Sequence, residues 1–101
     1  MSRLTEAHHE LARYIRWHAK VQACHFPGLD YEVDGTVQRY HRQDRYRDIN
    51  VVARNRRYLQ ELKRIVDGHV EEKAYGLRIS SEISGSARHP SEHILHLSIW
   101  P

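Results

Sequence analysis

Apolar residues recur at helical spacing through the first quarter of the chain. Between Arg3 and Cys24 they fall every three or four positions, on one side of a helix. They are Leu4, Ala7, Leu11, Tyr14, Ile15 and Ala19, with Val21 at the edge, and His18 falls on the same face. Ser2 is a suitable N-cap, because its hydroxyl can accept a hydrogen bond from a free backbone N–H. Phe26-Pro27-Gly28 ends the pattern, since proline cannot continue the helical ladder. We therefore predict an amphipathic helix over about residues 3–24.

A second helix is expected from Asp44 or Arg47 to Val70. Its apolar arc consists of Val51, Val52, Tyr58, Leu59, Leu62, Ile65, Val66 and Val70. Gly68 is a candidate early stop, although the apolar positions continue beyond it. If the arc is buried, one outward stripe remains, made of Asn50, Arg54, Arg57, Glu61 and Arg64. In this stripe Glu61 offsets part of the positive charge, since residues three and four apart on a helix are neighbours.

The last quarter of the chain alternates with a period of two, which is typical of strands with one dry and one wet face. Leu77, Ile79 and Ile83 alternate with polar residues, and after a loop so do Leu95, Leu97 and Ile99. Between the helices, Asp30–Tyr40 is centred on Asp34-Gly35. An Asp-Gly pair favours a tight hairpin in which both turn residues have positive φ, and an ordered loop is the alternative.

These elements predict an α+β fold, with two amphipathic helices packed on a small antiparallel sheet. The C-terminal hairpin forms the sheet, joined by the short hairpin between the helices if that hairpin forms. A chain of 101 residues supports one core, so residues 1–101 are expected to form a single domain.

Positive charge is concentrated in the middle of the sequence. The stretch from Arg39 to Val66 holds nine basic residues and three acids, a local charge of +6, whereas the whole chain has a net charge of +3. The remaining residues therefore carry a charge of −3. Such asymmetry indicates a class of partner rather than a fold, with a phosphate backbone first and an acidic protein surface second.

The candidate binding residues lie in this stretch. Two tyrosines alternate with arginines before the second helix, and three arginines belong to its outward stripe. The set is Arg39, Tyr40, Arg42, Arg45, Tyr46, Arg47, Arg54, Arg57 and Arg64. Aromatic rings stack on bases while guanidinium groups contact phosphates, as in proteins that bind single strands. Tyrosine and arginine are also enriched at the centres of protein–protein interfaces.

Three functions are therefore compatible with the sequence. The first is a small binding protein that contacts nucleic acid through phosphates. The second is a compact inhibitor or adaptor that binds an acidic protein surface, of the type found among small phage and plasmid proteins that act on nucleic-acid-processing complexes. The third is a small metal-independent nuclease. Exposure of Trp17 would favour a protein interface, and a homo-oligomer is left open.

Metal, cofactor and catalytic patterns are weak. The nine histidines show no HExxH or CxxC spacing, and no glycine-rich phosphate loop is present, so we expect no metal and no cofactor. Cys24 and His25 are adjacent, so on a helix their side chains diverge. No catalytic residue is assigned. A single cysteine, the absence of a signal-peptide pattern and the absence of a long apolar run favour a cytoplasmic protein that is not bound to a membrane.

Overall fold

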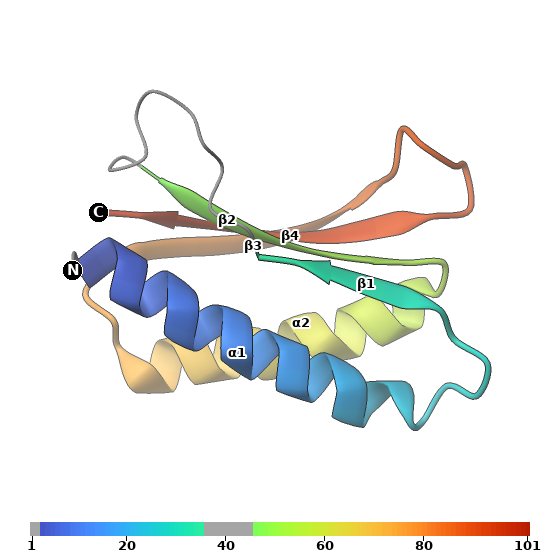
Figure 1. Cartoon of the computed structure of the whole chain (residues 1–101), viewed down its shortest axis with the longest axis horizontal. Coiled ribbons are helices and arrows are strands. Elements are labelled where there is room, and N and C mark those ends of the chain that lie inside the picture. The colour runs from blue at the N-terminus through green and yellow to red at the C-terminus, as the bar shows by residue number, and fades with distance from the viewer. Residues whose placement is uncertain (1–2, 36–45) are drawn as a thin grey trace.

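Two helices lie on one face of a four-stranded antiparallel sheet in the computed structural model, which describes residues 3–35 and 46–101 (Figure 1). The elements in chain order are α1 (Arg3–Ala23), β1 (Tyr31–Asp34), β2 (Arg47–Ala53), α2 (Arg56–Lys73), β3 (Arg78–Gly85) and β4 (His93–Trp100). The strand order is β1-β2-β4-β3, and every neighbouring pair is antiparallel. This arrangement confirms the predicted α+β fold.

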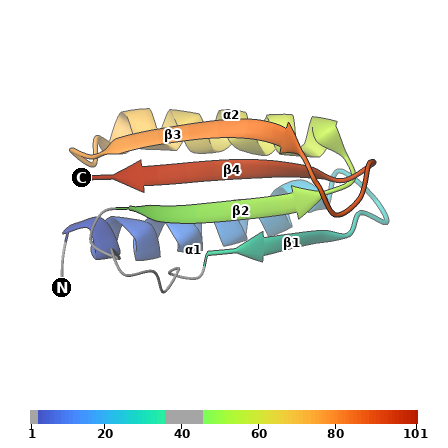
Figure 2. The same cartoon turned by 90° about the horizontal axis from the view of Figure 1, so that it is seen from above.

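The chain is built from two similar units, each a helix followed by two strands. The first unit is α1-β1-β2 and the second is α2-β3-β4. They meet where β2 pairs with β4 in the middle of the sheet (Figure 2). α1 lies under the half of the sheet that contains β1 and β2, and α2 lies under the other half.

The predicted start of the second helix is wrong, because residues 47–53 form the strand β2 instead. Ile49, Val51 and Ala53 alternate and point into the core, with 0–2% of their surface exposed. A short apolar run fits a strand or a helix equally well by periodicity, and pairing with two strands decides it. The helix begins after Asn55, whose side chain accepts a hydrogen bond from the Tyr58 backbone N–H at 3.1 Å. Asparagine is a common N-cap, so this start could have been read from the sequence.

The helix also continues past Gly68 to Lys73, three residues beyond the predicted end. It stops at Ala74, which has the left-handed backbone angles φ 52° and ψ 67°. The Ala74 N–H still donates to the Val70 carbonyl at 3.2 Å, which satisfies one carbonyl of the last turn.

The first half of the predicted hairpin between the helices forms a strand, but its observed partner is β2 rather than the residues after Gly35. β1 pairs with β2, from Tyr31 opposite Ala53 to Asp34 opposite Asn50. Gly35 does not have positive φ; the described glycines that do are Gly28 and Gly76. Gly35 instead lies against α1, where a Cβ would come within 3.2 Å of Ala12 Cβ. Residues 36–40, the second half of the predicted hairpin, and Ser2, the predicted N-cap, lie outside the described residues.

The core lies between the helices and the inner face of the sheet. Its fully buried side chains come from both helices and both central strands: Leu11, Ile15, Ile49, Val51, Tyr58, Leu59, Leu62, Val66, Leu95, Leu97 and Ile99. Tyr58 joins three elements, because its hydroxyl donates to the Ala19 carbonyl of α1 at 2.8 Å and its ring contacts Tyr31 of β1.

The outer face of the sheet is polar, and no described helix covers it (Figure 1). His96 of β4 ties it to β2, since its Nδ1 lies 2.6 Å from Asn50 Oδ1 and its Nε2 lies 3.0 Å from Ser98 Oγ. No helix in the described part of the chain is long and apolar enough to cross a membrane.

Candidate binding surfaces

The structure divides the predicted binding residues between separate places. Arg39, Tyr40, Arg42 and Arg45 lie outside the described residues. Tyr46 and Arg47 lie at the start of β2, whereas Arg54 and Arg57 lie just beyond its other end. Because a strand rises about 3.3 Å per residue, these two groups are about 20 Å apart.

Tyr46 and Arg47 are held by contacts within the protein. The Tyr46 ring stacks on Trp100, with ring centroids 4.9 Å apart, and its hydroxyl donates to Asp48 Oδ2 at 3.1 Å. The Arg47 side chain turns toward α1 and is only 8% exposed. It donates to the Tyr46 carbonyl at 3.0 Å and to Thr5 Oγ1 at 3.4 Å. Little of Arg47 is therefore accessible to a ligand.

The predicted outward stripe of the second helix is shorter than expected. Asn50 belongs to β2 and Arg54 lies on the bend before α2, so neither shares a helix with Arg57. Arg57 is exposed in the first turn, and Arg64 pairs with Glu61 at 2.5 Å. The expected Glu61–Arg64 neutralisation is present on the surface of α2.

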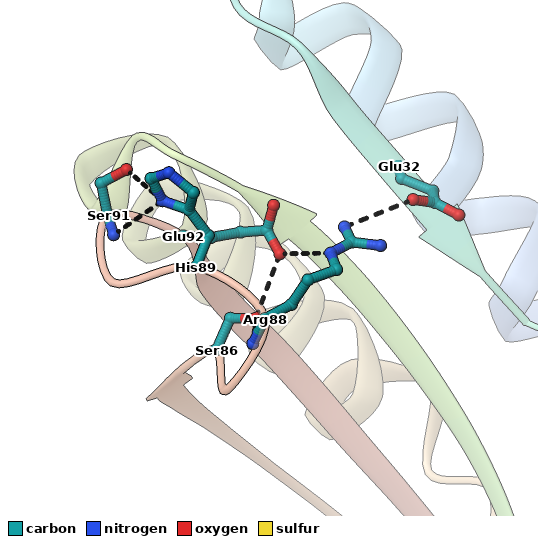
Figure 3. A network of polar contacts seen from close by, with 6 residues as sticks. All are labelled: Glu32, Ser86, Arg88, His89, Ser91 and Glu92. Atoms are coloured by element: carbon teal, nitrogen blue, oxygen red, sulfur yellow. Dashed lines mark hydrogen bonds and ion pairs between the residues drawn. The ribbon is translucent and has the colours of Figure 1, made fainter.

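A wide hollow, of about 1290 Å³, opens beside the start of α2. Arg54 and Arg57 line it together with Arg88 from the loop between β3 and β4. Figure 3 shows that Arg88 is already paired, since its Nε donates to Glu92 at 3.0 Å and its Nη2 lies 3.8 Å from Glu32. The hydrogen bond from Arg88 is the main reason that the pKa of Glu92 is lowered. In the described chain, no acid lies within ion-pair distance of Arg54 or Arg57.

A second basic surface lies on α1, outside the predicted set. We call it the α1 basic face, and it consists of Arg13, Arg16, Trp17 and Lys20. Trp17 is 63% exposed, the most exposed large apolar side chain in the described residues. None of the three cations has an acid within ion-pair distance among residues 3–35 and 46–101. A tryptophan this exposed on a helix is unusual, because large apolar side chains are normally buried.

Aromatic rings form the side of this face that meets α2. The Tyr14 ring stacks on His69 of α2, with centroids 3.6 Å apart and an interplanar angle of 11°, and it also contacts His18. His69 Nε2 lies 3.0 Å from the Tyr75 hydroxyl. Burial is the main cause of two pKa shifts here: the pKa of His69 is lowered, and that of Tyr75 is raised to about 12. The lowered pKa favours the neutral form of the His69 ring, which packs as an aromatic group against Tyr14.

The sequence contains the signal for the α1 basic face. With Leu11 and Ile15 buried, the spacing of Arg13, Trp17 and Lys20 places all three on the outward side of the helix at 100° per residue. The charge count did not reveal it, because acids elsewhere on α1, such as Glu6 and Glu10, lower the net charge of the segment. Glu10 is in fact paired with Lys73 of α2 at 3.0 Å.

No group of three or more potential metal ligands comes together within the described residues. Comparison with known proteins gives no match: no family model, no curated protein and no solved structure is significantly similar to this chain.

Proposed function

We propose that this protein is a small protein-binding domain, an inhibitor or adaptor, that docks its α1 basic face on an acidic surface of a larger assembly. The observation that carries the proposal is the exposed Trp17 beside three cations that form no ion pair within the described part of the chain. Covering the exposed part of this ring removes on the order of 100–150 Å² from water, worth about 3 kcal/mol at ~25 cal/mol per Å². Tryptophan and arginine are the residues most enriched at the energetic centres of protein interfaces.

Charge complementarity supports an acidic partner. Among residues 3–35 and 46–101, no acid is within ion-pair distance of Arg13, Arg16 or Lys20, so an external carboxylate adds an ion pair without breaking one of those described. Such charges chiefly raise the rate and specificity of association, while the buried tryptophan supplies affinity.

The same face is less suited to single-stranded nucleic acid. Binding of single strands uses several aromatic side chains on which successive bases stack. On this face Tyr14 is already in contact with the rings of His18 and His69, so Trp17 is the ring left to stack. A protein partner, which needs one anchor, fits better.

Nucleic-acid binding remains a second candidate, favoured by Arg54 and Arg57. Both are exposed beside the N-terminus of α2, whose first turn contains no acid. Unpaired guanidinium groups in such a position suit phosphate oxygens. Under this proposal the contact includes the preceding segment, with Arg39, Tyr40, Arg42 and Arg45.

Two matched double variants separate the candidates. Arg13→Glu/Lys20→Glu reverses charge on the α1 basic face, and Arg54→Glu/Arg57→Glu does so beside α2. Pull-downs with and without nuclease, at low and high salt, identify the partner, and circular dichroism verifies that each variant is folded. We expect a discrete protein that survives nuclease and is lost only in the first variant. Capture of nucleic acid that is lost only in the second variant would replace this proposal with the nucleic-acid one.

We further propose an intracellular location. Cys24 is the one cysteine of the chain and is exposed with a free thiol. Exposed unpaired thiols are most compatible with a reducing compartment.

A further inference from the structure

A groove runs between the α1 basic face and α2, on the side of the helices that faces away from the sheet. It has a volume of about 680 Å³ and is lined by the rings of Tyr14, Trp17 and His69. The charged residues of its lining are Glu10, Arg13, Arg16 and Lys20, and Glu10 is paired with Lys73 of α2. Figure 1 shows the two helices side by side in one layer, with no described element on their outer side. The groove is therefore lined by three aromatic rings and three cations, and its one acid, Glu10, is already paired with Lys73.

The groups that define this groove have a fixed spacing. Arg13, Trp17 and Lys20 are at positions i, i+4 and i+7 of one straight helix, so they form a line along its outer surface. At 1.5 Å per residue, the two cations are about 10.5 Å apart along the axis, with the indole ring between them.

We propose that the partner segment is an α-helix that lies along this groove and carries two acidic residues seven positions apart, with an aromatic or leucine side chain between them. This inference rests on the proposed function and adds the chemistry of the partner. The two carboxylates meet Arg13 and Lys20, and the apolar side chain packs against Trp17 and the Tyr14–His69 stack. The helical pair α1-α2 thereby becomes a three-helix layer.

A helix matches this spacing better than a strand. A second helix repeats the rise of α1, so acids seven positions apart fall about 10.5 Å from one another on one face. Residues on one face of a strand are about 6.6 or 13 Å apart, and neither distance matches. Helices laid in hydrophobic grooves with anchors at i, i+4 and i+7 are an established mode of peptide recognition.

Gly68 supports close approach of such a helix. It lies inside α2, where glycine costs about 1 kcal/mol relative to alanine. Nothing lies within 4 Å of the position that a Cβ would occupy, so packing inside the described fold does not require a glycine there. At 100° per residue, Gly68 falls between the outward side of α2 and the side that His69 presents to α1. The missing side chain leaves room for a neighbouring backbone beside His69, the residue of α2 that lines the groove.

Synthetic peptides test this inference by the fluorescence of Trp17. The protein carries Trp100→Phe, so that Trp17 is its single tryptophan. The probe is a helical peptide in which two glutamates seven positions apart flank a phenylalanine. One control peptide has the same composition with the glutamates on opposite helix faces, and the other has lysines in place of glutamates. We expect saturable binding of the probe, weaker by about tenfold or more for both controls and for Arg13→Glu/Lys20→Glu, and unchanged for Arg54→Glu/Arg57→Glu.

Equal binding of the probe and the face-scrambled peptide, or no saturable binding at all, would overturn the helical partner. The proposed function is judged separately, by whether Arg13→Glu/Lys20→Glu loses the captured protein. If that protein is lost but the probe does not compete for it, the surface is correct and the helix is wrong. If that protein is retained, the proposed function itself fails.

Discussion

Replacing Tyr58 by phenylalanine removes a single oxygen atom from the centre of the molecule. The side chain is 0% exposed, and its hydroxyl donates to the Ala19 carbonyl at 2.8 Å, which links α2 to α1. The ring itself packs edge-on against Phe26, with centroids 5.6 Å apart, and against Tyr31 at 5.8 Å. Phenylalanine keeps these ring contacts, so Tyr58→Phe isolates the hydrogen bond.

The expected cost follows from what each substitution removes. Losing one buried hydrogen bond between neutral groups lowers the free energy of unfolding by about 1 kcal/mol. In a chain of this size that corresponds to a fall in Tm of about 4–8 °C. Tyr58→Ala also removes the ring and leaves a cavity, so its cost should be about 3–5 kcal/mol. Tyr31→Phe is the matched control, because the described structure gives the Tyr31 hydroxyl no hydrogen bond, and it should change stability by less than about 0.5 kcal/mol.

Urea unfolding followed by circular dichroism measures these differences, and alkaline pH gives a second readout. Burial raises the pKa of Tyr58 above its ordinary value of 10.0. The unfolded chain therefore releases this proton first, and the associated stability is present below pH 10 and is lost as the pH rises above it. Tyr58→Phe should lose stability less steeply there than the wild-type protein. If Tyr58→Phe has the wild-type urea midpoint, the hydroxyl does not stabilise the contact between the helices. If Tyr58→Phe costs as much stability as Tyr58→Ala, the ring contacts do not contribute to stability.

Three further results are expected. Leu59→Ala should lower the free energy of unfolding by about 2–4 kcal/mol, because Leu59 is fully buried. Arg57→Ala should lower it by less than about 0.5 kcal/mol, because Arg57 is exposed. Equal losses in urea unfolding would contradict the orientation of α2. Gly68→Ala should raise the free energy of unfolding by about 0.5–1 kcal/mol, since alanine favours a helix and a Cβ meets no neighbour; a loss of stability would mean that the site is crowded. Burial lowers the pKa of His8 below 6.5, so the unfolded chain binds a proton first as the pH falls. The free energy of unfolding should therefore decrease below pH 6.5, and it should decrease less steeply in His8→Gln. The same urea midpoint at pH 7.5 and pH 5 would refute this.

The fold was predictable where the apolar residues follow a single repeat, either helical or alternating. Leu11, Ile15, Leu95 and Leu97 repeat clearly, and their elements were predicted within a few residues. The segment around Val51 was not predictable, because its short apolar run fits a helix and a strand equally well. It becomes a strand because β1 and β4 pair with it on either side. Those partners come from distant parts of the chain, which local spacing does not reveal.

The binding residues were harder to predict than the fold. Counting charge identified a basic stretch, but the count treats Arg47, which is buried against α1, like Arg57, which is exposed. It also overlooked Arg13 and Lys20, because Glu10 cancels charge in the sum while pairing with Lys73 on another helix. What decides a surface is which cations keep a free side chain after folding, and that depends on tertiary contacts.

The position of β4 has a consequence for how the chain folds. Although it follows every other described element in the sequence, it lies between β2 and β3. Its pairs with β2 join residues separated by 40 positions, as in Ala53 and His93, to 52 positions, as in Arg47 and Ile99. The two units form one continuous sheet only when this long-range pairing forms. Folding should therefore be a single transition, slower than in helical bundles of the same length, and the amides of β2 and β4 should exchange with solvent only when the whole molecule unfolds.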